Sequence, residues 1–381
     1  MNKAKENRKL SPYAYVSLAC AIVIALAMVF GAAVSLSRQN DVMRYEGVSI
    51  DEEMYCYWFS YYKMEAMAAY GISGKNDTQL FWKREMSDGV TYGEHLTKII
   101  DERIKTRLVC AYLFDSLGAS LPDYAKEEIN EYLSQTLDFV ADNDKKAFSE
   151  IAAKYGTSYD AIKKVAAFDY KSELLFTMTY GNGEYLSDEE KDEYYREKYS
   201  RVKVIFINTK TKSVTKGDDS SKVTVVELTE EEKKQKAELA DRVQEKLSPA
   251  DYDKFDELVA LYSEDSASSH YKNGFYLNEM SDYPVAEVTQ ASLDLKTGEW
   301  VRIESDYGIH FVMRYPLDDA AYDNKENSDW FDSFALDASL YFFDSYIKNE
   351  LDKVKVNEDV KSRHTIENIK YNYEIKPIIT D

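Results

Sequence analysis

The segment Tyr15–Leu36 constrains this chain most, because its 22 residues carry no charged side chain. A helix of roughly 20 apolar residues is long enough to cross the hydrocarbon core of a bilayer. The preceding residues 1–14 carry four Lys and Arg side chains against one Glu, and such positive flanks stay on the cytoplasmic side. The sequence therefore predicts a cytoplasmic tail (1–14), a single-pass anchor in the cell membrane (15–36) and an extracytoplasmic remainder.

A cleaved signal peptide is the alternative interpretation of this segment. Small residues around Gly31–Ser35 offer a cleavage site. The apolar core of a signal peptide usually has about 7–15 residues, however, so the length favours an uncleaved anchor. In either case the sequence predicts that the bulk of the chain is exported.

The charge and the cysteines exclude several classes of function. A formal net charge of -21 argues against a nucleic-acid partner, because phosphate binding depends on clustered Lys and Arg. The three cysteines, Cys20, Cys56 and Cys110, have spacings that match no zinc or redox motif. Cys56 and Cys110 lie in apolar helical surroundings and are predicted to be buried thiols rather than a disulfide. We therefore expect no metal site and no cofactor.

Residues 38–186 are predicted to form a helical domain. Apolar residues recur at three- and four-residue steps in four segments, His95–Leu117, Glu127–Val140, Lys145–Tyr155 and Ser158–Tyr180. A helix before them is unusually aromatic and has apolar residues on more than one face: Met54, Tyr55, Tyr57, Trp58, Phe59, Tyr61, Tyr62, Met64 and Met67. Two interpretations stay open for it, a helix buried on two sides and a surface that receives unfolded chains.

Residues 187–317 have a mixed helix and strand pattern. Capping boxes at Ser187–Glu190 and Thr229–Glu232 predict two helix starts. The β-branched residues of Arg201–Thr209 predict a strand between them. After Pro316, a charged linker precedes a helix predicted from Ser328 to about Val354.

The stretch Phe255–Tyr315 carries an ordered set of motifs. It contains F-x-E-L at Phe255–Leu258, a Ser-Glu-Asp-Ser turn at residues 263–266, L-x-x-G-E at Leu295–Glu299, and finally Gly308-Ile309-His310-Phe311. This series resembles the C-terminal half of a parvulin-type peptidyl-prolyl isomerase domain. The resemblance implies an α+β domain at 187–317, in which helices cover a small antiparallel sheet.

The order of the whole chain resembles the exported chaperone-isomerases of the PrsA and SurA kind. That resemblance implies a membrane-anchored helical chaperone body, formed by residues 38–186, into which the parvulin-like domain is inserted. It also implies that the C-terminal helix and tail (318–381) pack back on the helical domain.

The parvulin resemblance implies a set of catalytic residues. In the family, two histidines face each other on adjacent strands, and the second corresponds to His310, while Phe206 stands where the first is expected. Asp265 and Ser305 correspond to the family's acidic and hydroxyl positions. The residues themselves leave other interpretations open: a lone histidine on an apolar strand is often a structural core residue, and an aspartate in a turn often binds its own backbone.

The resemblance also implies a substrate pocket for the proline ring. Its residues here are Phe206, Tyr276, Met280 and Val288. Of the family's glycine-rich loop only Gly274 and the aromatic Tyr276 remain, and Val288 replaces a larger aromatic residue. Lost aromatic area weakens apolar binding, so the sequence predicts a shallower pocket.

Three hypotheses on function follow. The first is an extracytoplasmic foldase that isomerises prolyl bonds in newly exported, unfolded polypeptides. The second is a holdase chaperone with a catalytically degenerate parvulin-like domain, favoured by Phe206. The third is an envelope scaffold with one specific partner. The sequence leaves the oligomeric state open, a homodimer included.

Overall fold

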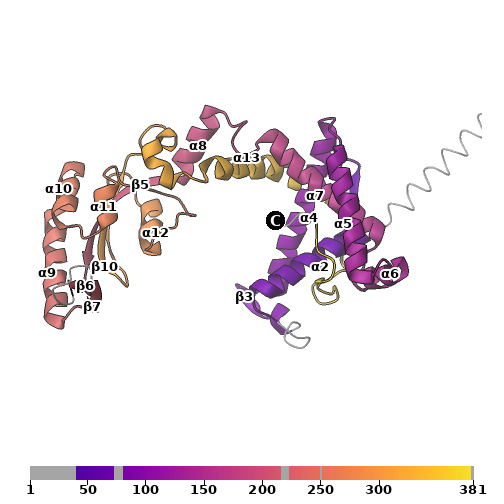
Figure 1. Ribbon diagram of the computed structural model, residues 1–381, viewed down its shortest axis with the longest axis horizontal. Helices are drawn as coiled ribbons and strands as arrows, with labels where there is room; N and C mark the ends of the chain where they lie inside the picture. Colours follow the sequence, from indigo (N-terminus) through magenta and orange to yellow (C-terminus); the bar gives the residue numbers. More distant parts are fainter. Residues whose placement is uncertain (1–39, 73–79, 216–222, 249–250, 379–381) are drawn as a thin grey trace, which may run out of the picture. The chain divides into compact units, whose positions relative to one another are not determined.

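The computed structural model describes residues 40–72, 80–215, 223–248 and 251–378 (Figure 1). The predicted anchor at residues 15–36 lies outside the described residues. Among the helices that are described, none combines the length and the apolar character that a membrane crossing requires. The chain divides into two compact units, a first of residues 1–179 and 343–381 and a second of residues 180–342.

The first unit is mainly helical. Its elements before the division are β1 (Asp41–Tyr45), β2 (Val48–Asp51), α2 (Glu52–Ala69), β3 (Glu85–Ser87), β4 (Val90–Thr91), α4 (Tyr92–Ser116), α5 (Asp123–Ala141), α6 (Lys145–Lys154) and α7 (Tyr159–Thr179). The four helices expected from the apolar periodicity are therefore present. Asp51 begins α2 by accepting a hydrogen bond from the Met54 backbone N–H at 3.0 Å.

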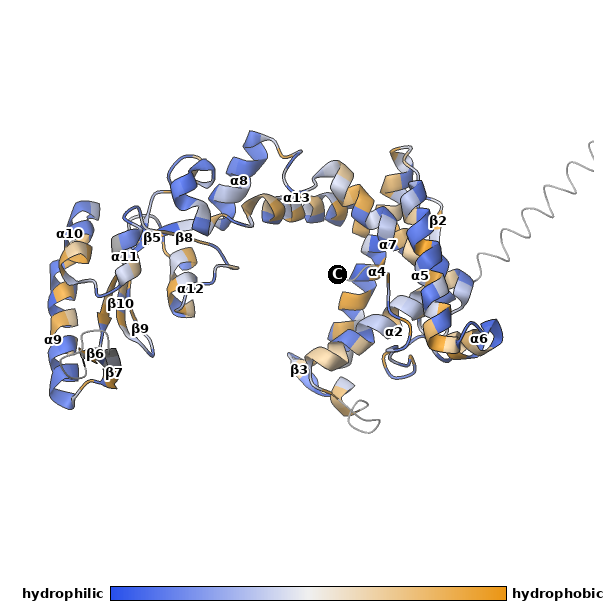
Figure 2. Cartoon of the chain, viewed as in Figure 1, coloured by the Kyte–Doolittle hydropathy of each residue, from blue (hydrophilic) through white to orange (hydrophobic). Residues whose placement is uncertain are grey.

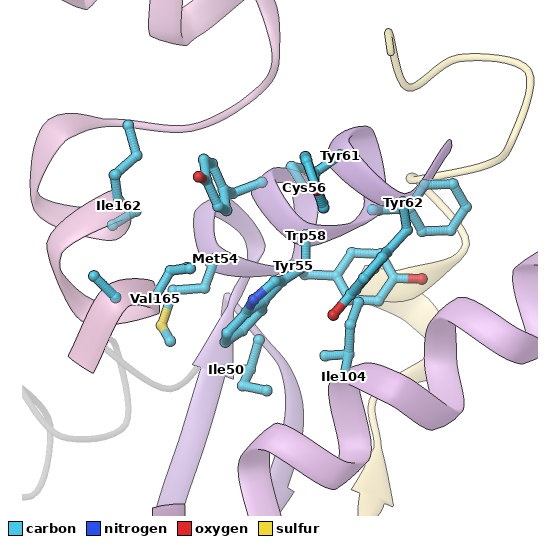
Figure 3. Packing of buried hydrophobic residues seen from close by; sticks show 14 of the residues in the cluster. Ile50, Met54, Tyr55, Cys56, Trp58, Tyr61, Tyr62, Ile104, Ile162 and Val165 are labelled. Atoms are coloured by element: carbon cyan, nitrogen blue, oxygen red, sulfur yellow. The ribbon is translucent and has the colours of Figure 1, made fainter. Parts of the chain in front are cut away.

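The aromatic helix α2 is the core of this unit. Every residue from Met54 to Lys63 is buried, and Figure 3 shows their side chains among Ile50, Ile104 and Ile162 from neighbouring elements. Each fully buried large apolar side chain stabilises a fold by about 1.5–3 kcal/mol. The interpretation of this helix as a core element is confirmed. The alternative, an exposed surface for clients, is wrong for α2, because helices on several sides remove its aromatic rings from solvent.

Both predicted thiols are buried and free, Cys56 in α2 and Cys110 in α4.

The chain returns to this unit through its C-terminal residues. β11 (Lys355–Val356) pairs antiparallel with β1, giving a three-stranded sheet in the order β11-β1-β2, and the short helix α14 (Glu358–Lys361) follows.

The second unit has the mixed composition that the sequence predicts. Its elements are α8 (Asp188–Lys198), β5 (Ser200–Asn208), β6 (Thr211–Thr215), β7 (Val223–Glu227), α9 (Glu230–Lys246), α10 (Tyr252–Tyr262), α11 (Ser266–His270), β8 (Phe275–Leu277), α12 (Ala286–Asp294), β9 (Trp300–Glu304), β10 (Gly308–Tyr315), and the 3-10 turns η1 (Ala321–Asp323) and η2 (Lys325–Trp330). Both predicted capping boxes are present, at α8 and at α9.

A four-stranded antiparallel sheet in the order β8-β5-β10-β9 organises this unit. One face carries Ile205, Ile309 and Phe311, which pack with α9 and α10. The other face carries Val204 and Val312, which pack with β8 and α12. Figure 2 shows α9 as a largely hydrophilic helix with hydrophobic residues at intervals, as expected of a helix that covers one side of a sheet. The predicted α+β fold class is confirmed.

The predicted C-terminal helix begins later than expected. Residues from Ser328 belong to η2, and α13 runs from Phe334 to Leu351. Phe331 interrupts the helix with φ -128° and ψ 19°. Its ring packs against Tyr195, Tyr199 and Phe334. The ring contacts of Phe331 therefore explain why the helix starts after this residue, although the periodicity of the sequence predicts an earlier start.

Gly274 allows a close approach of the chain to β5, and its replacement tests this part of the fold. It has φ +98°, and a Cβ there would lie 2.5 Å from the Val202 carbonyl oxygen. Gly298 has φ +87°, but its Cβ would meet only the Tyr252 hydroxyl, at 3.3 Å. We expect Gly298→Ala to cost about 1–2 kcal/mol of unfolding free energy through its backbone conformation.

Gly274→Ala is expected to cost about 1–3 kcal/mol more than this control, because the overlap adds to the same backbone strain. Urea denaturation of both variants measures the difference. Equal losses would contradict the close approach at Gly274.

Candidate functional site

The register of β5 and β10 brings Phe206 and His310 together. The two residues are direct antiparallel partners, and their rings stack with centroids 4.7 Å apart and planes at 21°. His310 is 3% exposed. The predicted juxtaposition on adjacent strands is confirmed, while the catalytic role of His310 stays a prediction.

Ser305 fixes the orientation of the His310 imidazole. Its Oγ lies 2.8 Å from His310 Nε2. The same oxygen accepts hydrogen bonds from the backbone N–H groups of Tyr307 at 3.1 Å and Gly308 at 3.4 Å. Because these amides occupy its lone pairs, the hydroxyl is left to donate its proton. His310 Nε2 is a nearer acceptor than the Gly308 carbonyl oxygen.

The direction of this hydroxyl bond decides the tautomer of the imidazole. With the hydroxyl donating to Nε2, the neutral ring carries its own proton on Nδ1. With the hydroxyl donating instead to the Gly308 carbonyl oxygen at 3.4 Å, the ring proton lies on Nε2. The shorter distance to Nε2 favours the proton on Nδ1.

The Nδ1 atom of His310 is buried and has no hydrogen-bond partner among the described residues. A buried donor without a partner costs about 1–3 kcal/mol, so an arrangement of this kind is uncommon unless a ligand completes it. Burial lowers the pKa of His310, although the charges of Asp265 and Glu287 oppose this effect. The site therefore contains a desolvated, neutral imidazole whose Nδ1 atom is buried and has no protein partner among the described residues.

Asp265 belongs to the turn that covers the part of β5 beyond its pairing with β8. Its carboxylate accepts the Ala267 backbone N–H at 2.9 Å and the Ser268 hydroxyl at 3.1 Å, and so begins α11. In the same turn, the Glu264 N–H donates to the Phe206 carbonyl at 2.7 Å. The structural interpretation of Asp265 is confirmed by these bonds. The turn is bonded to Phe206, the strand partner of His310, and the charge of Asp265 acts to raise the pKa of His310.

The other predicted pocket residues, Val288, Met280 and Tyr276, do not lie together. Val288 is fully buried in α12, in the apolar cluster on the same sheet face as Val204. Met280 is 83% exposed in the turn after β8. Tyr276 pairs with Arg201 and packs with the tyrosine cluster around Tyr195, away from that face. The structure thus brings His310, Ser305, Phe206 and Asp265 together and leaves Tyr276 and Met280 apart from them.

Tyr283 is a residue of this site that the sequence analysis missed. It lies in the segment between β8 and α12, where its ring packs against Phe275 at 5.4 Å. Tyr283 also packs against the apolar cluster on this sheet face. Burial raises the pKa of Tyr283, and the charge of Asp265 raises it further. Its position directly before Pro284, at the start of the segment that leads into α12, is the signal that could have identified it.

A pocket of about 440 Å³ lies beside this site, on the edge of β5. Ser263 and Ser268 line it together with Tyr271 and the ion pair between Lys203 and Asp256. The described residues contain no group of His, Cys, Asp and Glu that could hold a metal ion. The lining of the pocket offers hydroxyl and charged groups for hydrogen bonding and apolar groups for contact.

A scan against protein-family models gives no match to this chain, and a search of curated proteins finds none either. Among solved structures, PrsA from Bacillus subtilis is 20% identical, covers 74% of this chain and 92% of its own, and has a TM-score of 0.23. A peptidylprolyl isomerase (PrsA) from Bacillus cereus is 15% identical, with 74% and 98% covered and a TM-score of 0.27. A structure described with SurA-like chaperones of Campylobacter jejuni is 11% identical, with 74% and 92% covered and a TM-score of 0.20.

The chain is similar to PrsA and SurA-like proteins. These are the proteins that the sequence resemblance names. Because the TM-scores are between 0.20 and 0.27, the matches carry no further argument about this chain. The fold assignment depends instead on the sheet order and the helices described above.

The burial of His310 predicts a pH dependence of stability. Its folded pKa is lowered from 6.5, so the unfolded chain takes up a proton first as the pH falls. The stability due to the neutral ring is present above about pH 6.5 and is lost below it. We expect His310→Gln to lose less unfolding free energy than the wild type between pH 7.5 and 5, as measured by urea denaturation. An identical loss in both proteins would contradict a desolvated imidazole.

Proposed function

We propose that this chain is an extracytoplasmic, membrane-anchored foldase that binds unfolded exported polypeptides and isomerises their prolyl bonds. The observation that carries the proposal is the buried His310 imidazole, held by Ser305 and left without a partner at Nδ1. The sequence resemblance of the motifs in Phe255–Tyr315 to parvulin-type isomerases supports the same class of activity.

Prolyl isomerisation requires few chemical groups from a protein. Its barrier of about 18–20 kcal/mol arises because rotation breaks the resonance of the amide. A catalyst therefore needs to stabilise the twisted amide more than the planar one, which preorganised donors in a desolvated site can do. No nucleophile, metal or cofactor is required.

Each residue of the site then has a role. When a bound prolyl peptide displaces the side chains that cover it, the His310 Nδ1–H donates to the twisting amide, where the proline nitrogen regains its lone pair. Ser305 holds the ring in that orientation. Phe206 and Val288 form apolar walls that exclude water from the bond. The Asp265 carboxylate repels the peptide carbonyl oxygen, so that this oxygen points away from the turn.

A holdase without isomerase activity is the second candidate function. Phe206 in place of a histidine favours it, because the stacked ring offers no hydrogen bond to the amide. The exposed Met280 and the distant Tyr276 also leave the proline ring with fewer apolar contacts than a parvulin pocket would give. Both candidates bind unfolded chains and differ only in catalysis.

A protease-coupled isomerisation assay with short Xaa-Pro peptides distinguishes the two. We expect the full chain to exceed the spontaneous rate, and Ser305→Ala to lower kcat/KM roughly tenfold or more, because the imidazole loses its orientation. Ser333→Ala is the matched control, since it removes an exposed hydroxyl bonded to Asp337. A rate equal to the spontaneous one, from a chain shown to be folded, would rule out the isomerase and leave the holdase.

The proposed anchor at residues 15–36 has its own test. We expect the chain to sediment with membranes, to resist extraction by high salt and to be released by detergent, because about 20 buried apolar residues hold far more strongly than surface charge. Deletion of residues 1–37 should release it. A full chain that leaves membranes in high salt would contradict the anchor.

A further inference from the structure

The C-terminal residues 362–378 lie on the first unit without forming a helix or a strand. Their main chain is held by residues of the helical body. Lys63 Nζ donates to the carbonyl oxygens of Ile366 and Ile369, and the Asn372 N–H donates to the Ser60 carbonyl at 2.9 Å. Because these bonds involve backbone groups of the tail, they place no requirement on its side chains.

A further main-chain bond lies nearer the end of the tail, where Tyr132 donates its phenolic proton to the Lys376 carbonyl at 2.5 Å. Figure 3 shows the pale yellow C-terminal segment passing beside the helix that carries Tyr61 and Tyr62. The body therefore contacts the backbone of the tail at points spread over eleven residues, and the tail itself is irregular, with a turn at Thr365–Ile369.

The side chains of the tail follow a simple pattern. Ile366, Ile369 and Ile375 are buried, with exposures of 5%, 6% and 0%. Exposed residues lie between them, including Lys370 and Tyr373. The surface of the first unit that the tail covers, called the groove below, thus takes branched aliphatic side chains from an irregular segment. Asn372 between them is also buried, whereas Lys370 and Tyr373 stay exposed.

Lys63 is unusual among the aromatic residues of α2. It is 5% exposed, and burial lowers its pKa to about 8. A buried ammonium is costly unless acceptors surround it, and here the acceptors come from the tail. An apolar side chain at this position would pack with the neighbouring rings but could not bind a peptide backbone.

Two cavities border the tail. One cavity of about 830 Å³ lies against Ile366, and another of about 380 Å³ lies against Ile369 and Tyr371. Trp82 lines both cavities, is 1% exposed, and has an indole N–H without a partner among the described residues. The tail therefore leaves a buried donor unsatisfied and neighbouring space unfilled.

We propose that this groove is a binding site for irregular segments of non-native polypeptide with branched aliphatic residues, and that the tail occupies it as an internal competitor. Lys63 donates hydrogen bonds to carbonyl oxygens of the client backbone. The positions that Ile366, Ile369 and Ile375 occupy in the free protein bind the apolar side chains of the client. The inference depends on the proposed function, the binding of unfolded chains, and adds the site and its regulation. A client must then displace residues 362–378 to bind.

Hydrogen–deuterium exchange on the full chain in detergent tests this displacement. The probe is reduced, carboxymethylated α-lactalbumin, which stays unfolded, and its binding is followed by fluorescence anisotropy. We expect saturation with the probe to raise amide exchange within residues 362–378 several-fold, because the Asn372 N–H leaves the Ser60 carbonyl. Binding with unchanged exchange in this segment would overturn the inference alone. Absence of binding would overturn the proposed function itself.

Substitutions in the tail provide a second test that leaves the groove intact. Ile375→Ser removes the most deeply buried anchor, so the tail should occupy the groove less and the probe should bind roughly tenfold more tightly. Tyr373→Ser is the matched control, because this side chain is 61% exposed, and it should leave the affinity unchanged. Unchanged affinity in a folded Ile375→Ser chain would contradict the competition. If that variant does not fold, the exchange measurement on the wild type decides.

Discussion

The antiparallel register of β5 and β10 is the constraint on which the candidate site depends. Because side chains alternate between the faces of a strand, a shift of one residue would exchange the two faces. The observed register sends Ile205 and Ile309 toward α9 and α10 and places Phe206 opposite His310. The two helices thus secure the pairing, and the pairing positions the imidazole. Stability and site geometry come from the same interaction.

The aromatic helix α2 has the corresponding role in the first unit. Its rings form a core that the other helices cover, while Ser60 and Lys63 make polar contacts with the C-terminal tail. A helix buried in this way offers no exposed surface to a client. The groove that the tail occupies is therefore the site on this unit that we propose for unfolded chains.

Much of this fold could be predicted from local patterns, and the exceptions have physical causes. The capping boxes at Ser187 and Thr229 mark real helix starts because the bonds that define them lie within four residues. The motif around Gly308 and His310 identified the strand and its partner Phe206. The start of α13 could not be predicted, because Phe331 leaves the helix for contacts with Tyr195 and Tyr199, which lie far away in the sequence. The separation of Tyr276 from His310 likewise depends on strand pairing that no motif specifies.

The central claim is that His310 presents an Nδ1–H group to a substrate. The most direct measurement is ¹⁵N NMR of the imidazole, with and without a saturating Xaa-Pro peptide, combined with exchange spectroscopy of the peptide's cis and trans signals. The account predicts a proton on Nδ1 in the free protein, a change in the Nδ1 shift on binding, and faster cis–trans exchange. A proton on Nε2, or an imidazole whose signals do not change while the peptide binds, would contradict it.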